Sequence, residues 1–186
     1  MPHSSTLSRR AVRGTVAGLF LAGAVLVAAA NPTSAGDNGG LTATIRDNCE
    51  AVSFNAAVGP GTCVGDGNTT FDQFVAALPA GGHPKWRNQT GSGELKSGGS
   101  ISVVNRGGEF HSFTEVVDYG GGIVDFINQV GGFGAGPATT VTPFNPLTDL
   151  VPPGGKTTIT MLAPGTHKFQ CMIHPWMRST ITVRNR

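Results

Sequence analysis

Three side chains in the last part of the chain have the types and the spacing of metal ligands. Cys171, His174 and Met177 recur at intervals of three residues, after one expected strand and before the next. A thiolate and an imidazole bind soft and borderline metals strongly, and a thioether can lie farther away as a weak axial ligand. Each residue type alone more often packs in a core, but the three together predict a metal site. Methionine is a poor zinc ligand, so the set favours copper.

A fourth ligand has to come from another part of the chain, and His111 is the best candidate. It follows an expected strand and the Gly107-Gly108 turn, and it opens another strand. Two histidines, a cysteine and a distant methionine form the ligand set of a blue-copper electron-transfer site. His83 and His167 are the other histidines outside the first 35 residues. We expect neither to bind copper.

The segments around these residues predict an all-β sandwich. The chain has 28 glycines, 12 prolines and only 13% charged residues, a composition typical of many turns and unlike that of a coiled coil. The expected strands are residues 41–46, 101–105, 112–117, 157–162, 167–171 and 180–184. Two short helices are also expected. One follows a capping box of Thr70 and Gln73, and the other covers residues 123–130.

Residues 1–35 are predicted to be an export signal. Arg9, Arg10 and Arg13 precede an uncharged, mostly apolar run, and small residues surround Ala35 at the expected cleavage site. We therefore expect a periplasmic or secreted protein, and the Ser-Arg-Arg sequence is similar to a twin-arginine leader. An uncleaved leader would instead anchor the protein in a membrane. Beyond residue 35 ten basic residues face eleven acidic ones, so the charge does not suggest nucleic-acid binding.

The three cysteines suggest one disulfide and one cysteine with a different role. Cys49 and Cys63 flank a short segment that contains glycine and proline, and closing this loop would stabilise the fold by about 3 kcal/mol. Cys171 stands apart from them. A lone thiol in an oxidising compartment is exposed to damage unless it is buried or bound to a metal.

The segment from Gly165 to Val183 resembles the C-terminal ligand loop of the cupredoxins, the type 1 blue-copper family. Its Cys-x2-His-x2-Met spacing is most similar to the short loop of amicyanin, and Val103 to His111 resembles the strand and turn that deliver the first histidine ligand. The resemblance covers roughly residues 95–186 and implies a Greek-key β-sandwich core with one copper ion. Residues 36–94 form an N-terminal extension that is packed on the sandwich or is part of it. The ligands implied are His111, Cys171, His174 and Met177.

The resemblance also implies a function and a contact surface. Cupredoxins carry single electrons between transient redox partners. We therefore expect a monomer that carries electrons in the same way. Their second histidine lies near the surface in an apolar patch, so His174 would be the electron exit, with Pro175 and Trp176 in the docking surface. The chain departs from the family at Ser112, where many members have asparagine, and at His167, where many have an aromatic residue. These departures concern residues near the ligands, which help to set the reduction potential of the metal.

Other functions stay open at this point. A periplasmic or extracellular copper carrier or storage protein could use the same four donors without redox cycling. A metal-free interaction sandwich could use the N-terminal extension as its binding surface. An enzyme is not expected, because the chain lacks the His-x-His pairs of multicopper oxidases and has too few spare histidines for a copper nitrite reductase.

Overall fold

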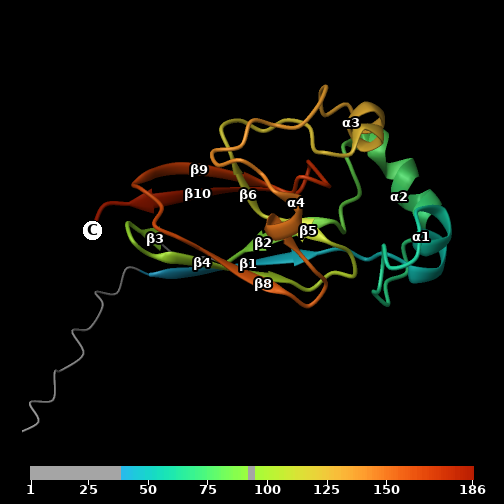
Figure 1. Cartoon of the computed structure of the whole chain (residues 1–186), viewed down its shortest axis with the longest axis horizontal. Helices are drawn as coiled ribbons and strands as arrows, with labels where there is room; N and C mark the ends of the chain where they lie inside the picture. Colours follow the sequence, from blue (N-terminus) through green and yellow to red (C-terminus); the bar gives the residue numbers. More distant parts are fainter. Residues whose placement is uncertain (1–38, 92–94) are drawn as a thin grey trace, which may run out of the picture. The chain divides into compact units, whose positions relative to one another are not determined.

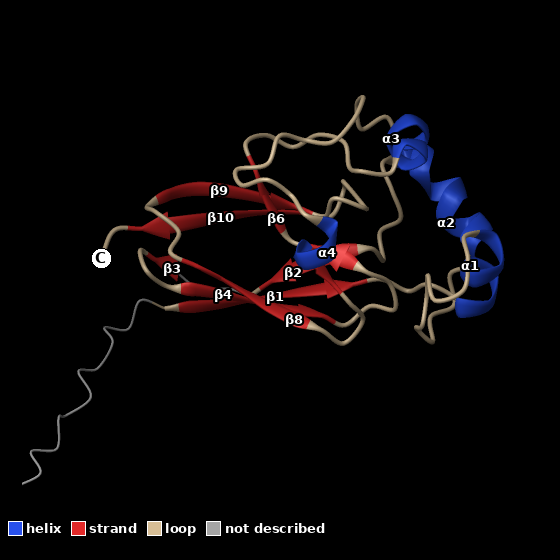
Figure 2. Ribbon diagram, in the orientation of Figure 1, coloured by secondary structure: helices blue, strands red, loops and turns tan. Residues whose placement is uncertain are grey.

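The computed structural model describes residues 39–91 and 95–186, and the predicted export signal lies outside them. The described part is a β-sandwich with a few short helices, which confirms the predicted fold class (Figures 1 and 2). No helix in these two ranges is long and apolar enough to span a membrane.

The first sheet brings the N-terminal segment into the centre of the fold. Its strand order is β2 (Arg87–Thr90), β1 (Gly40–Arg46), β4 (Ser100–Asn105) and β8 (Lys156–Thr160). β1 runs parallel to β4 and antiparallel to β2. Alternate residues of the two central strands are buried, as expected for a half-buried sheet, and these are Leu41, Ala43, Ile45, Ile101, Val103 and Asn105.

The second sheet carries the strands that flank the predicted ligand loop. Its order is β3 (Leu95–Lys96), β10 (Arg178–Arg184), β9 (Gly165–Gln170) and β6 (Thr114–Val116). The antiparallel pair of β9 and β10 places residues 171–177 in the connection at one end of the sandwich.

The expected strand 112–117 is divided in the structure. β5 (His111–Ser112) pairs with β7 (Leu150–Val151), whereas β6 pairs with β9 of the second sheet. The chain therefore changes partners at Phe113, and this change separates the strand that holds His111 from the sheet whose strand β9 leads into Cys171.

In the described part of the chain, four short α-helices lie in the connections: α1 (Ala51–Ala57), α2 (Phe71–Ala77), α3 (Asp125–Gly131) and α4 (Pro146–Asp149). A short 3₁₀ helix, η1 (Leu78–Ala80), follows α2 directly. The capping box predicted for α2 is confirmed, with reciprocal hydrogen bonds between Thr70 and Gln73. The helix expected over residues 123–130 is also confirmed as α3, although it begins at Asp125 and ends at Gly131. Figure 2 shows α1, α2 and α3 gathered at the same end of the sandwich.

A disulfide joins Cys49 to Cys63, as predicted from the sequence, with 6.2 Å between the Cα atoms. It ties the residues that follow β1 to the segment that leads into α2. Cys171 has a free, buried thiol. The bridge therefore restrains the end of the molecule at which α1 and α2 lie.

Candidate metal centre

His111, Cys171 and His174 converge in the interior. The Cys171 Sγ atom lies 3.7 Å from Nδ1 of His111 and 3.9 Å from Nδ1 of His174. The two Nδ1 atoms are 3.2 Å apart. All three side chains are buried, and their ligand atoms lie within 4.8 Å of one another. His111, which lies 60 positions or more from the other two residues in sequence, thus joins Cys171 and His174 at a common point with two nitrogens and one sulfur.

The loop from Cys171 to Met177 is closed by its own main chain. The amide of Cys171 donates to the carbonyl of Met177 at 3.0 Å, and the amide of Met177 donates to the carbonyl of His174 at 2.9 Å. Met177 is buried, with 1% of its surface exposed. These bonds fix the spacing of the three loop residues that the sequence singled out.

Ser112 connects β5 to the ligand loop. Its amide donates to the Cys171 sulfur at 3.4 Å, and its hydroxyl accepts from the amide of Met172 at 2.9 Å. The amide of His174 also points at the sulfur, 3.5 Å away. Hydrogen bonds to a cysteine ligand help to set its electron density. Ser112, which departs from the family pattern, therefore contacts both the sulfur of Cys171 and the amide of the next residue, Met172.

The electrostatic environment favours a thiolate at Cys171. Burial alone would raise the pKa of this thiol, but the hydrogen bonds and charges of His111 and His174 hold it well below its usual value. Burial opposes the charge on His111 too, yet Asp47 and Cys171 together raise the pKa of His111 to about 9. The Asp47 carboxylate resists protonation despite burial, because its hydrogen bond with His111 contributes to a pKa of about 2. A metal would meet an anionic sulfur, which is the form that binds metals.

Each histidine also faces a carboxylate with its other ring nitrogen. Nε2 of His111 lies 2.8 Å from Oδ2 of Asp47, and Nε2 of His174 lies 3.8 Å from Oε2 of Glu109. Oε2 of Glu109 accepts a hydrogen bond from the indole of Trp86. Burial raises the pKa of Glu109. The sequence offered no spacing signal for these acids, since Asp47 and Glu109 come from separate turns.

Aromatic side chains lie around His174, which was expected near the surface in an apolar patch. The residue is buried, but it also lines an apolar hollow of about 270 Å³ together with Phe74 and Ile173. Only 2% of its surface is exposed. The enclosing group, which we call the aromatic cluster, consists of Phe54, Phe74, Trp86 and Trp176. The ring centroids of Phe74, Trp86 and Trp176 lie 5.9, 6.5 and 5.4 Å from that of His174. Phe54 packs against both Phe74 and Trp86. Phe54, Phe74 and Trp86 come from α1, α2 and the residues after α2, which the resemblance did not include, whereas Trp176 belongs to the ligand loop itself.

Trp176 is the partly exposed member of the aromatic cluster. Its indole nitrogen donates to the carbonyl of His83 at 3.2 Å, and its ring stacks on Phe133 at 5.6 Å. Gly82 makes this position possible, because a Cβ atom there would overlap the indole ring. Pro175, which was also expected in a docking surface, is buried.

The two remaining histidines of the described ranges lie outside the three-residue cluster, as expected. His83 packs against Trp86, with ring centroids 5.0 Å apart. His167 lies between Glu115, 2.6 Å from its Nδ1 atom, and the carbonyl of Ala163, 2.8 Å from its Nε2 atom. Neither ring is directed at Cys171.

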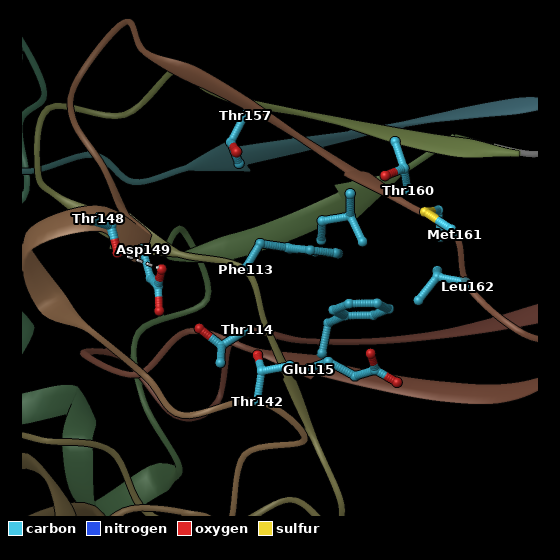
Figure 3. A pocket seen from close by; sticks show the side chains of 12 residues that line it. Phe113, Thr114, Glu115, Thr142, Thr148, Asp149, Thr157, Thr160, Met161 and Leu162 are labelled. Carbon is cyan, nitrogen blue, oxygen red and sulfur yellow. Dashed lines mark hydrogen bonds between the residues drawn. The ribbon is translucent and has the colours of Figure 1, made fainter. Parts of the chain in front are cut away.

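A cavity of about 370 Å³ on the sandwich is a separate feature (Figure 3). Its walls include Phe113, Glu115, Asp149 and Met161, with threonines from several strands. None of His111, Cys171 and His174 lines it. We therefore assign it no part in the metal chemistry.

The donor set fits copper. Among the described residues, two imidazole nitrogens and a thiolate form a cluster that contains no carboxylate, and a buried thioether follows on the same loop. A second group, formed by Asp47, Cys49 and Glu109, also has close polar atoms. The sulfur of Cys49 is held in the disulfide, however, so this group lacks a thiolate.

Comparison with solved structures finds similarity to cupredoxins. A purple cupredoxin from Nitrosopumilus maritimus is 18% identical over 48% of this chain and 74% of its own, with a TM-score of 0.34. A reduced amicyanin mutant is 19% identical over 48% of this chain and 65% of its own, with a TM-score of 0.30. The similarity concerns the fold of about half of this chain. No family model matches the sequence, and no curated protein does.

Proposed function

We propose that this chain is an exported mononuclear type 1 copper protein that carries single electrons between two redox partners. The observation that carries the proposal is the buried convergence of Nδ1 of His111, Nδ1 of His174 and Sγ of Cys171. His111, Cys171 and His174 would hold the metal, and Met177 would supply the weak axial ligand. We further propose that the protein works as a monomer in the periplasm or outside the cell.

Copper, when bound, supplies a couple that changes by one electron between Cu(II) and Cu(I). The protein's part is to keep the donors in one arrangement for both states. The main-chain bonds of the 171–177 loop, the Ser112 contacts and the pairing of β5 with β7 all restrain the donors. Burial also keeps water away from the cluster. Both features reduce the rearrangement that accompanies each transfer.

The burial of His174 moves the proposed electron exit toward Trp176. Within the aromatic cluster the indole ring of Trp176 lies nearest to His174, with 5.4 Å between ring centroids, and it is partly exposed. A partner protein would therefore dock over Trp176. The electron would pass from the metal through His174 to the indole ring and then to the partner. Pro175 would support the loop from the interior. Transient redox complexes bury little area, so a small patch is sufficient.

The enclosed site favours a relay over a copper carrier or storage protein. A carrier has to hand its metal to another set of ligands, and such an exchange is easiest when one ligand is accessible. Here the three strong donors are all buried, and His174 lies behind aromatic rings. An electron can pass to a neighbouring ring without movement of the donors, whereas release of the metal would require a buried ligand to move. An enzymatic role is not part of the proposal.

The test is a titration of the purified protein with Cu(II), followed by visible absorption and electron paramagnetic resonance. We expect an intense sulfur-to-copper charge-transfer band that saturates at one copper ion per chain. Ascorbate should bleach the band, and an oxidant should restore it over repeated cycles without loss of metal. The matched control is Cys171→Ser, which retains the size of the side chain and should lose the intense band.

Three outcomes would contradict the electron-carrier proposal. A strongly coloured Cys171→Ser protein would refute the ligand assignment. Colourless copper binding, or release of copper on the first reduction, would favour a carrier or storage role. A protein that binds no copper and keeps its stability on replacement of Cys171 would favour a metal-free interaction sandwich.

A further inference from the structure

Asp47 occupies a position that the sequence did not mark as functional. It is the first residue after β1, and its side chain lies in the interior, with 1% of its surface exposed. One carboxylate oxygen, Oδ1, accepts hydrogen bonds from the amides of Cys49 and Gly108. The other, Oδ2, accepts from the amide of Glu109 and lies 2.8 Å from Nε2 of His111. The carboxylate is thus held by three amides and faces one imidazole.

We propose that Asp47 is a positioning residue of the metal centre: it holds the Nε2–H group of His111, so that Nδ1 is the nitrogen presented to copper. This inference rests on the proposed function. A carboxylate on the far nitrogen of a metal-binding histidine fixes the ring orientation and the tautomer and makes the ring a stronger ligand. Because Oδ2 accepts a hydrogen bond and Nδ1 faces the sulfur of Cys171, the two ring nitrogens have different and compatible roles.

The Gly107-Gly108 turn is shaped for this contact. A Cβ atom on Gly107 would overlap the Asp47 carboxylate, and one on Gly108 would lie only 2.8 Å from the sulfur of Cys49. Neither glycine has a positive φ angle. Glycine is needed at both positions because neighbouring atoms lie too close to leave room for a Cβ atom. The turn lets the end of β1 and the disulfide lie directly against the segment that leads to His111.

The second carboxylate near the centre has a different role. Oε2 of Glu109 is 3.8 Å from Nε2 of His174, which is beyond hydrogen-bond distance, and it accepts from the indole of Trp86. Direct contact between a carboxylate and a ligand histidine is therefore limited to Asp47 and His111 among the three-residue cluster. The N-terminal segment, through Asp47, becomes part of the site.

The direct test observes the proton on His111. Nitrogen-15 NMR of the histidine rings, in the metal-free protein and in the reduced copper protein, should show Nε2 of His111 protonated in both. We expect its proton to exchange slowly with water, because Asp47 and its neighbours bury it. A His111 ring without a proton on Nε2, or with a rapidly exchanging one, would overturn the proposal. The metal-free measurement stands even if the copper titration fails, so the two proposals can fail separately.

Two variants test the consequence for the metal. Asp47→Asn removes the charge, and Gly107→Ala retains the carboxylate but displaces it from His111. In both we expect a raised reduction potential and an affinity for Cu(II) that is about 10- to 100-fold lower. The control is Asp118→Asn, which removes an equal charge from an exposed side chain paired with Lys168. A folded Asp47→Asn protein with the potential and affinity of the control would overturn the proposal. If that variant does not fold, the NMR result on the unaltered protein decides.

Discussion

At the scale of single residues, Met177 has the clearest separable role. It is buried, and its main chain closes the ligand loop through hydrogen bonds with Cys171 and His174. Those bonds involve only backbone atoms. The thioether can therefore be removed while the loop keeps its closure, and this separates the axial ligand from the architecture of the loop.

We predict that Met177→Leu keeps copper and the intense band but raises the reduction potential, because the weak axial ligand tunes the potential. The swap conserves volume, so the free energy of unfolding should fall by less than about 1.5 kcal/mol. Voltammetry and the visible spectrum measure the effect. Met172→Leu is the matched control, since Met172 is also buried and its sulfur faces Gln170. Equal shifts in the two variants would argue against Met177 as the axial ligand.

The residues that the sequence could identify are those related by short spacing. Cys171 and His174 lie three positions apart on one loop, so the chemistry of the motif is visible in the sequence. His111 was predicted as a ligand because it follows the Gly107-Gly108 turn, and the structure places it beside Cys171 and His174. Asp47 could not be found in this way, because its relation to His111 exists only after β1 and β4 pair in parallel.

At the scale of elements, the connection from β6 to α3 supports the ligand loop from outside. The amide of Ile123 donates to the carbonyl of Met172, and Gly122 lies against the same carbonyl. A side chain at position 122 would overlap this carbonyl group. The glycine-rich stretch before α3 therefore acts on the geometry of residues 171–177.

Gly122→Ala should displace the ligand loop. We expect a shifted charge-transfer band, weaker Cu(II) binding and a free energy of unfolding lower by about 1–3 kcal/mol, the usual cost of overpacking. Urea unfolding and the copper titration measure these effects. Gly40→Ala is the control, because a Cβ atom there meets its nearest neighbour, the carbonyl of Ser100, at an ordinary 3.8 Å. An unchanged spectrum in Gly122→Ala would show that the loop does not depend on this support.

Elements with a strong local pattern were predictable, and those without one were not. The alternating strands β1 and β4 and the capped helix α2 follow from the sequence. β2 has the sequence Arg-Asn-Gln-Thr and lies at the edge of its sheet, so it carries no apolar alternation. α1 begins at Ala51, is capped by Glu50 and buries only Phe54, which leaves no helical periodicity to detect. The sequence analysis therefore predicted neither element. Phe54 on α1 packs behind the rings that contact His174, so this part of the aromatic cluster was not predicted.

At the scale of the whole molecule, one ion pair links two neighbouring strands of the second sheet. Nδ1 of His167 on β9 lies 2.6 Å from Oε1 of Glu115 on β6. Burial acts against the charged ring, but the hydrogen bonds with Glu115 and with the carbonyl of Ala163 raise the pKa of His167 overall. The pair is partly exposed, so its contribution is limited to about 1 kcal/mol.

The sign of the resulting pH dependence follows from the raised pKa of His167. The stabilisation is complete below the unfolded value of about 6.5 and is lost as the pH rises through the higher folded value. We predict that His167→Gln lowers the free energy of unfolding at about pH 5.5 and has a smaller effect at about pH 9. Urea unfolding of both proteins at the two pH values measures this. A difference that stays constant or grows with pH would contradict the assignment.

The aromatic cluster over His174 has a consequence for a solution that contains both oxidised and reduced copies of this protein. Two copies cannot bring their His174 rings together, because Phe74, Trp86 and Trp176 lie around each ring. An electron that passes between identical molecules has to cross two such layers. If the protein carries electrons as proposed, we expect self-exchange to be slow and transfer to a partner that fits over Trp176 to be faster.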